Sequence, residues 1–419
     1  MRTWYTNLDV LSIIFWCLLV IFGLAAIYST THGPASEFLL ETVRDNYNRQ
    51  LLWFAICSIG LIIALLLPVR FYQHAAFPVY FLTIVLLVSA LMFGREINGA
   101  KSWIQLGSLQ LQVSELAKVG TVLGVAKLVS LRRPKTMDLK FALMVVGMIL
   151  LPAALIILQN DMGTALVFLG LIPIALFWSG LKLDLLIILI GPVIAGYLAI
   201  VYEPAAWVFA VGLTLFMYFR THDAKFTFAT GLFSIGSVLV ASVALTQLLQ
   251  PHQVARILSF TDPGAEQFRL NEGFQQVQSM AAIGSGGWAG KGFMQGTQTQ
   301  GVFVSEQSTD FVFSVIGEEF GFLGSLFVLI LFLSLLLRLV QLGSRIKHPF
   351  GLMMAAGTVG IYLIHIFINI GMATAILPVI GIPLPFLSYG GSALLANTAL
   401  LAIVVSLYMR RDDFSIYGY

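Results

Sequence analysis

Charged residues are scarce in this chain of 419 residues. Only 10% of the residues are charged and 58% are hydrophobic, whereas a soluble domain is about a quarter charged. The net charge is +3 and there is no long basic run, so nothing points to a nucleic-acid-binding protein. The composition excludes an ordinary soluble domain and indicates a polytopic protein surrounded by membrane lipids.

Cysteine is almost absent as well. Cys17 and Cys57 both lie in apolar runs without metal-ligand spacing, so the sequence supports neither a disulfide nor a cysteine-based metal site. Only Arg2 is basic ahead of the first apolar run, and similar runs follow along the whole chain. We therefore predict a retained first helix rather than a cleaved signal peptide.

Long apolar runs are what the sequence has in abundance. A helix that crosses the hydrocarbon core needs about 20 apolar residues, and this rule predicts an all-α membrane protein with about twelve spans. The predicted spans are 9–29, 50–68, 74–93, 114–131, 141–158, 163–180, 182–201, 204–219, 226–249, 311–339, 352–373 and 391–409.

Basic residues predict the orientation of these spans. With a cytoplasmic N-terminus, fourteen Lys and Arg residues fall in inner segments and seven in outer segments, in agreement with the positive-inside rule. Both termini are then cytoplasmic, and the large loop 250–310 is extracytoplasmic. This loop is rich in Gly, Gln and aromatic residues, and loops of such length are usually functional or disordered. We expect it to be ordered and to form part of a site.

Four long motifs carry a family resemblance. They are NGAKSWIQLGSLQLQVSELAK (98–118), QNDMGTAL (159–166), IGSGGWAGKGFMQGTQTQGVFVSEQSTDFVFSVIGEEFGFLG (283–324) and NIGMATAILPVIGIPLPFLSYGGSAL (369–394). In this order they resemble the SEDS family, bacterial membrane glycosyltransferases that polymerise lipid II into peptidoglycan. GTQTQ and PLPFLSYGGSAL are more similar to the elongation branch, RodA, than to the division branch, FtsW.

The resemblance implies a single SEDS domain over residues 1–419 in the bacterial cytoplasmic (inner) membrane, with its active site on the outer face. The family has ten helices, so residues 202–250 are expected to be an inserted helix pair. The family also has prolines where this chain has Val113 and Asn160, which leaves open the angle at which each motif enters its helix.

The implied reaction assigns roles to several residues. A sugar hydroxyl attacks an anomeric carbon that is linked to pyrophosphate, so one base and some cations suffice, unlike in a two-carboxylate glycosidase. Asp310 occupies the family's catalytic position where the outer loop enters the membrane. Partial burial there would raise its pKa into a range useful for a general base, although an aspartate at this place could also be a helix cap.

The carboxylates near Asp310 have open alternatives. Glu306 could share a helical face with Asp310 or lie in a solvated loop, and Glu318 and Glu319 are expected to be structural. A carboxylate at bilayer depth is costly unless it is functional or firmly paired.

The expected substrate-binding residues lie in the other motifs. Glu115 and Lys118, at i and i+3 on one helix, form either an internal ion pair or a site in which Lys118 meets the lipid pyrophosphate. The remaining substrate-binding candidates are Lys101, Trp103, Asp161, Arg269 and Lys291. No cofactor is predicted with certainty, and the reaction is compatible with a divalent cation.

Two further segments invite interpretation. GSGGWAGKG (284–292) fails the Walker pattern and is predicted to be a tight turn. The proline-rich run 378–391 cannot be a regular helix and should be a re-entrant or outer loop buried against protein.

His365 and Asn369, one helical turn apart, form either a packing pair or part of the site.

The rival functions are a lipid II flippase and another polytopic transporter, for which repeats in matching halves would be expected. The large outer loop contains no SxxK or KTG pattern for acyl transfer. The resemblance therefore implies a class B penicillin-binding protein as partner. Its membrane helix is expected on spans 311–339 and 352–373, where Gly343, Gly351, Gly357 and Gly360 would permit close approach.

Overall fold

The computed structural model describes residues 7–33, 40–97, 99–106, 109–132, 138–248, 254, 257–269, 273–301, 303–304 and 306–412. Each of the predicted spans overlaps one long helix. These helices are α1 (Val10–His32), α3 (Asn46–Leu66), α4 (Val69–Phe93), α5 (Val113–Ser130), α6 (Leu139–Leu158), α7 (Met162–Trp178), α8 (Leu183–Val201), α9 (Glu203–Thr221), α10 (Ala224–Val243), α15 (Val312–Arg345), α16 (Pro349–Ala373) and α17 (Gly391–Met409). The prediction of a polytopic, mainly α-helical membrane protein is confirmed.

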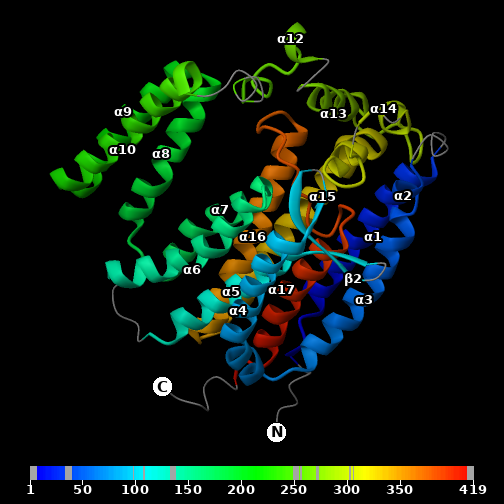
Figure 1. Cartoon of the computed structure of the whole chain (residues 1–419), viewed down its shortest axis with the longest axis horizontal. Coiled ribbons are helices and arrows are strands. Elements are labelled where there is room, and N and C mark those ends of the chain that lie inside the picture. The colour runs from blue at the N-terminus through cyan, green and yellow to red at the C-terminus, as the bar shows by residue number, and fades with distance from the viewer. Residues whose placement is uncertain are drawn as a thin grey trace.

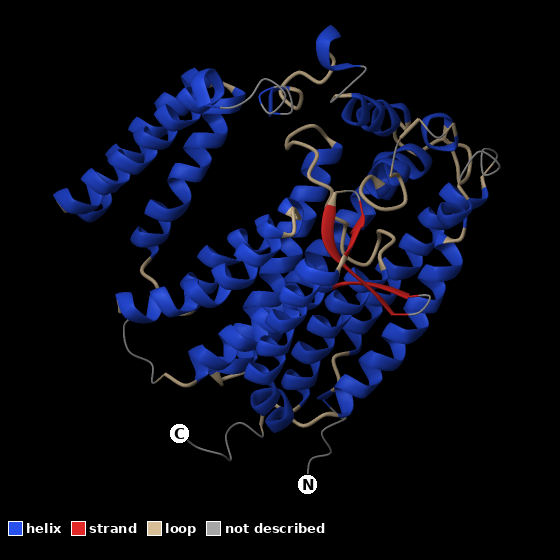
Figure 2. Ribbon diagram, viewed as in Figure 1, coloured by secondary structure: helices blue, strands red, loops and turns tan. Residues whose placement is uncertain are grey.

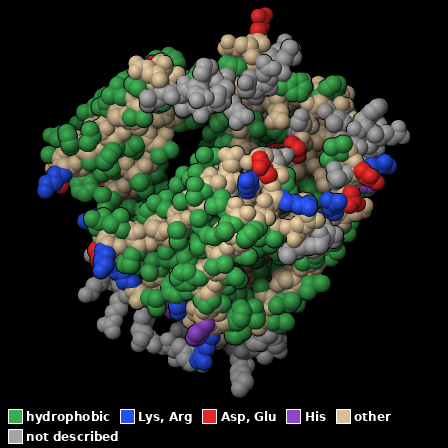
Figure 3. Space-filling view, in the orientation of Figure 1, with side chains coloured by type: hydrophobic (Ala, Val, Ile, Leu, Met, Phe, Trp, Pro, Cys, Tyr) green, Lys and Arg blue, Asp and Glu red, His purple; other side chains and the backbone are tan. Residues whose placement is uncertain are grey.

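Ten of these helices, within the described residues, are long and apolar enough to cross a membrane by composition. Of the other two, α5 carries Glu115, Lys118 and Lys127, and α7 has 17 residues. Helix α17 is buried along most of its length and lies at the centre of the bundle in Figure 1. Hydrophobic side chains cover most of the visible face in Figure 3, as expected for a surface in contact with lipid.

A small antiparallel sheet was missed by the all-α prediction. Strands β1 (Arg95–Ile97), β2 (Ala100–Leu106) and β3 (Leu109–Gln112) pair in chain order between α4 and α5, as Figure 2 shows. Trp103 pairs with Gln112 across β2 and β3. The alternation of apolar and polar residues in SWIQLGSLQLQ has the period of a strand, and this signal was present in the sequence.

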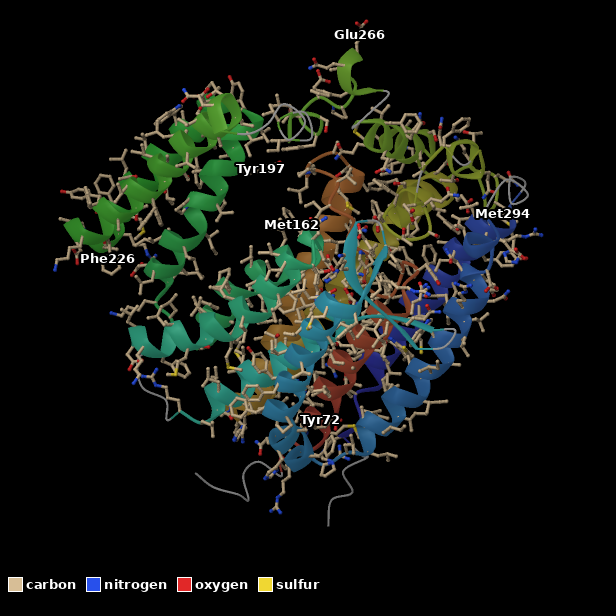
Figure 4. All side chains as sticks on the ribbon, in the orientation of Figure 1. Tyr72, Met162, Tyr197, Phe226, Glu266 and Met294 are labelled. Carbon is tan, nitrogen blue, oxygen red and sulfur yellow. The ribbon has the colours of Figure 1, made fainter. Side chains whose placement is uncertain are left out.

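Helices α8, α9 and α10 form a unit beside the main bundle (Figure 1). They share a small separate core of Ala195, Ala199, Ala206, Ala210 and Val238. At the outer end of α8, which Figure 4 marks with Tyr197, the tyrosine hydroxyl donates to the Ile376 carbonyl at 2.6 Å. The predicted helix pair is therefore present as α9 and α10, while its origin as an insertion stays a prediction.

The large loop contains ordered structure in its described part. Short helices α12 (Glu266–Arg269), α13 (Phe274–Ser285) and α14 (Thr297–Gln300) lie between α10, with its terminal π-turn Ala244–Leu248, and α15. Another short helix, α2 (Glu41–Arg44), stands between α1 and α3. The predicted tight turn at 284–292 is confirmed, because Gly287, Gly290 and Gly292 all have positive φ angles that favour glycine.

This tight turn packs against a break in α15 at Gly321, where φ is 65° and ψ is −159°. The amides of Lys291 and Gly292 donate to the carbonyls of Glu318 and Glu319 at 3.0 and 3.1 Å. In return, the amides that follow the break donate to carbonyls of the turn. The backbone groups released by the kink are therefore satisfied by the loop, as a buried break requires.

The predicted non-helical run 378–391 is non-helical up to residue 390, within a longer segment 374–390, and its second half is buried against protein. Ile382, Leu384 and Leu387 are buried, and a Cβ placed on Gly23 in the middle of α1 would lie 2.6 Å from Leu387 Cα. The segment thus descends from the outer end to the middle of a spanning helix. We call residues 374–390 the re-entrant loop.

Candidate active site

Asp310 lies in a tight turn that ends where α15 begins. The Glu306 carbonyl accepts hydrogen bonds from the amides of Thr309, Asp310 and Phe311 at 3.0–3.2 Å. Glu306 itself has a φ of 51°, an uncommon conformation for a residue with a side chain. The Asp310 side chain accepts no bond from the first turn of α15, whose N-cap is Phe311. The helix-cap alternative for Asp310 is therefore wrong.

The pKa of Asp310 is raised to about 7, first because burial disfavours its charged form and second because the Glu306 carboxylate lies nearby. Desolvation and a neighbouring like charge both have this effect on a carboxyl group. The Glu306 side chain is solvent-exposed and accepts from the Thr309 hydroxyl at 3.0 Å. A carboxyl group with a pKa near neutrality can accept a proton at the pH at which it works.

Helix α16 joins the turn that carries Asp310 to the re-entrant loop. The Asn369 side-chain amide donates to the Asp310 carbonyl at 2.8 Å and to the Ile382 carbonyl of the re-entrant loop at 2.7 Å. One turn earlier, His365 Nδ1 lies 3.1 Å from the Pro383 carbonyl. His365 and Asn369 are therefore part of the site's framework rather than a packing pair alone.

The re-entrant loop approaches Asp310 most closely at Gly381. A Cβ built on Gly381 would lie 3.2 Å from Asp310 Oδ2, and Gly381 has a φ of +75°. Both the space and the backbone conformation favour glycine here.

We expect Gly381→Ala to lower polymerising activity at least about tenfold, because the strained backbone and the new methyl group displace the carboxyl group, and 1 Å errors in such geometry are costly. Gly180→Ala is the matched control, since Gly180 has a φ of +97° and open space around its Cβ. Turnover and thermal stability of both variants check this. Equal loss of activity in the two would assign the effect to backbone strain alone.

A buried polar cluster lies on α5 and α16. Lys118 Nζ is 2.7 Å from Glu115 Oε2 and 2.8 Å from His365 Nε2, and the Lys118 and Glu115 side chains are each only 1% exposed. Because Nε2 accepts from an ammonium group, Nδ1 of His365 carries the proton that it donates to Pro383. This buried ammonium faces protein partners, in agreement with the ion-pair alternative, and the expected contact of Lys118 with a pyrophosphate stays a prediction.

Lys118→Met should therefore lower stability by about 3–5 kcal/mol, because it leaves the Glu115 charge buried without a partner. The double variant Glu115→Gln/Lys118→Met should regain most of that loss, as measured by thermal unfolding. Polymerisation by the double variant distinguishes a stabilising role of Lys118 from a role in substrate binding. Recovered activity would mean that the pair only stabilises the site, and a stable but inactive protein would mean that Lys118 acts on the substrate.

Asp161 is the N-cap of α7. Its carboxylate accepts from the Thr164 amide at 3.1 Å, from Gln112 Nε2 at 3.1 Å and from the Ser114 hydroxyl at 2.9 Å. These bonds hold the start of α5 to the start of α7. The interactions of Asp161 are thus structural ones, and its expected role in substrate binding stays a prediction.

The two missing prolines have different consequences. Val113 is the first residue of α5, a place where proline is tolerated but not required, so the helix start is kept. Asn160 has a φ of 62°, which proline cannot adopt, and its side chain donates to the Gly99 carbonyl at 2.9 Å. The second motif therefore has a backbone turn that its proline version could not form.

The other predicted substrate-binding residues lie on separate elements. Lys101 is exposed and Trp103 is half-buried on β2, where the Lys101 amide donates to the Gln159 carbonyl at 2.9 Å. The Arg269 side chain lies outside the described residues. Lys101 and Trp103 remain accessible to a substrate.

Lys291 is engaged elsewhere in the protein. Its ammonium contacts Glu318 Oε1 at 2.7 Å and the hydroxyls of Ser285 and Thr297 at 2.7 and 2.6 Å. All three of its protons have protein acceptors, so Lys291 is poorly placed to bind phosphate. Glu318, expected to be structural, pairs with Lys291.

In the described part of the chain, no group of three or more His, Cys, Asp or Glu residues could hold a metal ion. The compatibility of the reaction with a divalent cation stays a prediction.

Sequence reasoning overlooked the link between α3 and the turn 306–311 that carries the candidate base, which we call the catalytic turn. The Asn46 side chain donates to the Ser308 hydroxyl at 3.3 Å, and the Tyr389 amide donates to the Ser308 carbonyl at 2.8 Å. The Tyr389 side chain is hydrogen-bonded to Arg49. Arg49 was counted only as an outer basic residue, and its position at the outer end of a span was the available signal.

Comparison with known proteins gives consistent matches. The family model FtsW/RodA/SpoVE, described as cell cycle protein, matches residues 9–220 and 205–413. The chain is 32% identical to the peptidoglycan glycosyltransferase RodA of Treponema pallidum, over 97% of this chain and 98% of the relative.

Two solved structures are similar over nearly all of both chains. One, described as "Structural coordination of polymerization and crosslinking by a peptidoglycan synthase complex", has a TM-score of 0.70 at 26% identity and covers 96% of this chain and 98% of that chain. The other is the rod shape determining protein RodA of Thermus thermophilus, with a TM-score of 0.63 at 26% identity and 98% of each chain covered.

Proposed function

The chain belongs to the FtsW/RodA/SpoVE family of cell cycle proteins and is a peptidoglycan glycosyltransferase, and we propose that it polymerises lipid II with Asp310 as the general base. The observation that carries the assignment of the base is the placement of Asp310. It is a carboxyl group with a pKa near 7 at the start of a spanning helix, held between Asn369 and the re-entrant loop.

The chemistry that this site would perform is simple. Asp310 takes the proton of the acceptor hydroxyl while the hydroxyl oxygen bonds to the anomeric carbon of the donor. The bond from that carbon to pyrophosphate breaks, and its electron pair leaves with the lipid pyrophosphate. A strong general acid is unnecessary, since this leaving group departs as an anion. Lys101 and Trp103 on the exposed sheet are our candidates for substrate contacts, and Glu115 and Lys118 support the site from within the bundle.

The direct test is incubation of the purified protein with lipid II, followed by separation of the products by length. Glycan strands that depend on Asp310 would support the proposal. Translocation of lipid II without polymer would instead support the flippase alternative, which has no need for a base.

We place both termini in the cytoplasm and the active site on the outer face. The bias of basic residues supports this orientation. Helix α1 begins and α17 ends at one end of the bundle (Figure 1), where Arg411 donates to Asn7 at 3.3 Å. Asp310 and the re-entrant loop lie toward the opposite end.

We also propose a partner, a class B penicillin-binding protein that cross-links the glycan. The expected docking face on spans 311–339 and 352–373 stays a proposal, but the four glycines do not support it, because they pack inside this chain. A Cβ on Gly343, Gly357 or Gly360 would meet Ala355, Val122 or Ile174, respectively, within 3.0 Å, and one on Gly351 would meet Ile346 at 2.4 Å. These glycines pack against side chains of this chain, so they are not available to a partner helix.

Our candidate surface for a partner is an exposed apolar stripe on α15. Its exposed residues are Phe322, Leu326, Ile330, Leu333 and Leu337, and their spacing of three or four places them on one helical face.

Single cysteines along the α15 stripe, in a background without Cys17 and Cys57, should cross-link to cysteines in the partner's membrane helix. Val208 on α9 and Leu239 on α10 are matched controls, since both are apolar and at least half exposed. Gel mobility of the products measures capture. Capture at Val208 or Leu239 with none at the stripe would move the interface to the α8–α10 unit.

A further inference from the structure

The outer ends of α1, α2 and α3 form an open cavity that the proposed reaction does not yet use. Its volume is about 540 Å³, and it is lined by His32, Glu41, Arg44, Asp45, Asn48 and Arg49. This volume lies in the usual range for small-ligand sites, roughly 300–1,000 Å³. Figure 3 shows acidic and basic side chains gathered on this part of the surface. We call it the outer cavity.

Among the described residues that line the outer cavity, the carboxylates and guanidinium groups are equal in number. Asp45 and Arg49 form an ion pair at 2.9 Å, and hydrogen bonds from Asn48 and Arg49 hold the pKa of Asp45 below its ordinary value. Glu41 and Arg44 make no ion pair with any described residue, so one carboxylate and one guanidinium are available to a ligand.

Aromatic rings stiffen one side of the outer cavity. The His32 ring stacks on Tyr28 with centroids 4.4 Å apart and an interplanar angle of 10°. Tyr47 meets both rings edge-on at 5.1 and 5.5 Å. Such packed rings are held in place and offer an apolar face beside the charged groups.

Helix α3 connects the outer cavity to the catalytic turn. Arg49 lines the cavity and is hydrogen-bonded to Tyr389, whose amide donates to Ser308, two residues before Asp310. Asn46, on the same helical turn as Arg49, also bonds Ser308. A ligand in the cavity would therefore have a fixed position relative to the base.

We propose that the outer cavity binds the peptide of the lipid-linked disaccharide peptide, an inference that rests on the proposed function. Pyrophosphate carries only negative charge and would meet the carboxylates of Glu41 and Asp45. A sugar is neutral and gains little from unpaired charges. A peptide with free carboxylates and a free amine matches a lining that has one available group of each sign, because charge-assisted hydrogen bonds are strong and directional.

The experiment compares two lipid II substrates that share lipid and sugars, one with the full pentapeptide and one trimmed to its first residue. Arg44→Gln should raise KM for the full substrate about tenfold, the loss of one charge-assisted contact, and leave KM for the trimmed substrate unchanged. Arg95→Gln is the control, since Arg95 is exposed on β1 outside the cavity, and it should change neither. An equal effect on both substrates, or no effect on either, overturns the proposal.

Binding of the free disaccharide pentapeptide, without lipid or pyrophosphate, is measured alongside by calorimetry. Arg44→Gln should weaken this binding, and Glu41→Gln should weaken it only when the peptide amine is not acetylated. A preparation that binds the pentapeptide in this way but makes no polymer would contradict the proposed function and support the cavity. Polymerisation together with unchanged pentapeptide binding in both variants would support the proposed function and contradict the peptide site in the outer cavity.

Discussion

Replacing Asp310 with asparagine should reduce glycan polymerisation by about 10²–10⁴-fold, the usual contribution of a general base. The side chain keeps its shape and loses only its ability to accept a proton, so the protein should fold and still bind lipid II. Product length on gels and binding of labelled lipid II measure the two effects. Full polymerisation by a well-folded Asp310→Asn protein would exclude Asp310 as the base.

The pH dependence of the wild-type rate provides a second measurement of the same group. With a pKa of about 7, the charged fraction of Asp310 is about a tenth at pH 6 and about nine-tenths at pH 8. The rate should rise over this interval. Glu306→Gln is the control, because removal of its charge lowers the pKa of Asp310, shifting the profile to lower pH while keeping the rate at pH 8.

Stability should change in the opposite direction with pH. The pKa of Asp310 is raised in the folded state, so folding binds a proton between about pH 4 and pH 7. The contribution is fully present below about pH 4, the range of an unfolded aspartate, and is lost as the pH rises through 7. Asparagine removes this dependence, so Asp310→Asn should gain in thermal stability relative to the wild type from pH 5 to pH 8.

The sequence predicted the spanning helices well, since apolar runs of sufficient length have few alternatives in a membrane. It also located the re-entrant loop, because prolines at 378, 383 and 385 exclude a regular helix there. The sheet was missed because its strands lie within a motif that was interpreted for its polar residues. Asp310 itself was assigned by its position at the membrane surface together with the family motif.

Two further expectations, on Lys118 and on the four glycines, depended on how the helices pack, which the spacing of residues along the sequence cannot reveal. Lys118 is on the same face as Glu115, as predicted, but only tertiary packing decides whether that face meets a substrate or His365. The four glycines of α15 and α16 permit close approach, as predicted, but of this chain's own helices. A small residue indicates close packing at its position, but which neighbour packs there depends on the arrangement of all the helices.

Glu318→Gln should strongly weaken the attachment of the outer loop to α15, the helix in which Glu318 lies. Glu318 Oε1 accepts from the amides of Thr297 and Gln298 at 2.8 and 2.9 Å, and Oε2 accepts from the Thr299 amide at 2.8 Å. Lys291 adds its ammonium at 2.7 Å. A glutamine would direct an NH2 group at some of these donors and remove the charge that pairs with Lys291. Because the Lys291 side chain is 25% exposed, the main cost is the unsatisfied buried donors, about 1–3 kcal/mol.

The neighbouring Glu319→Gln is a matched control, because Glu319 is equally buried and the substitution has the same shape. Glu319 Oε1 accepts from Ser29 and Gln300, and the Met294 amide is a further donor to this carboxyl group. Unlike Glu318, Glu319 makes no ion pair with a described residue, so a glutamine there leaves no ammonium group without its carboxylate. Thermal unfolding and hydrogen exchange over residues 285–300 should therefore separate the two variants, with a large loss of protection only in Glu318→Gln. Similar losses in both would mean that the loop is held by burial of the helix rather than by this one carboxylate.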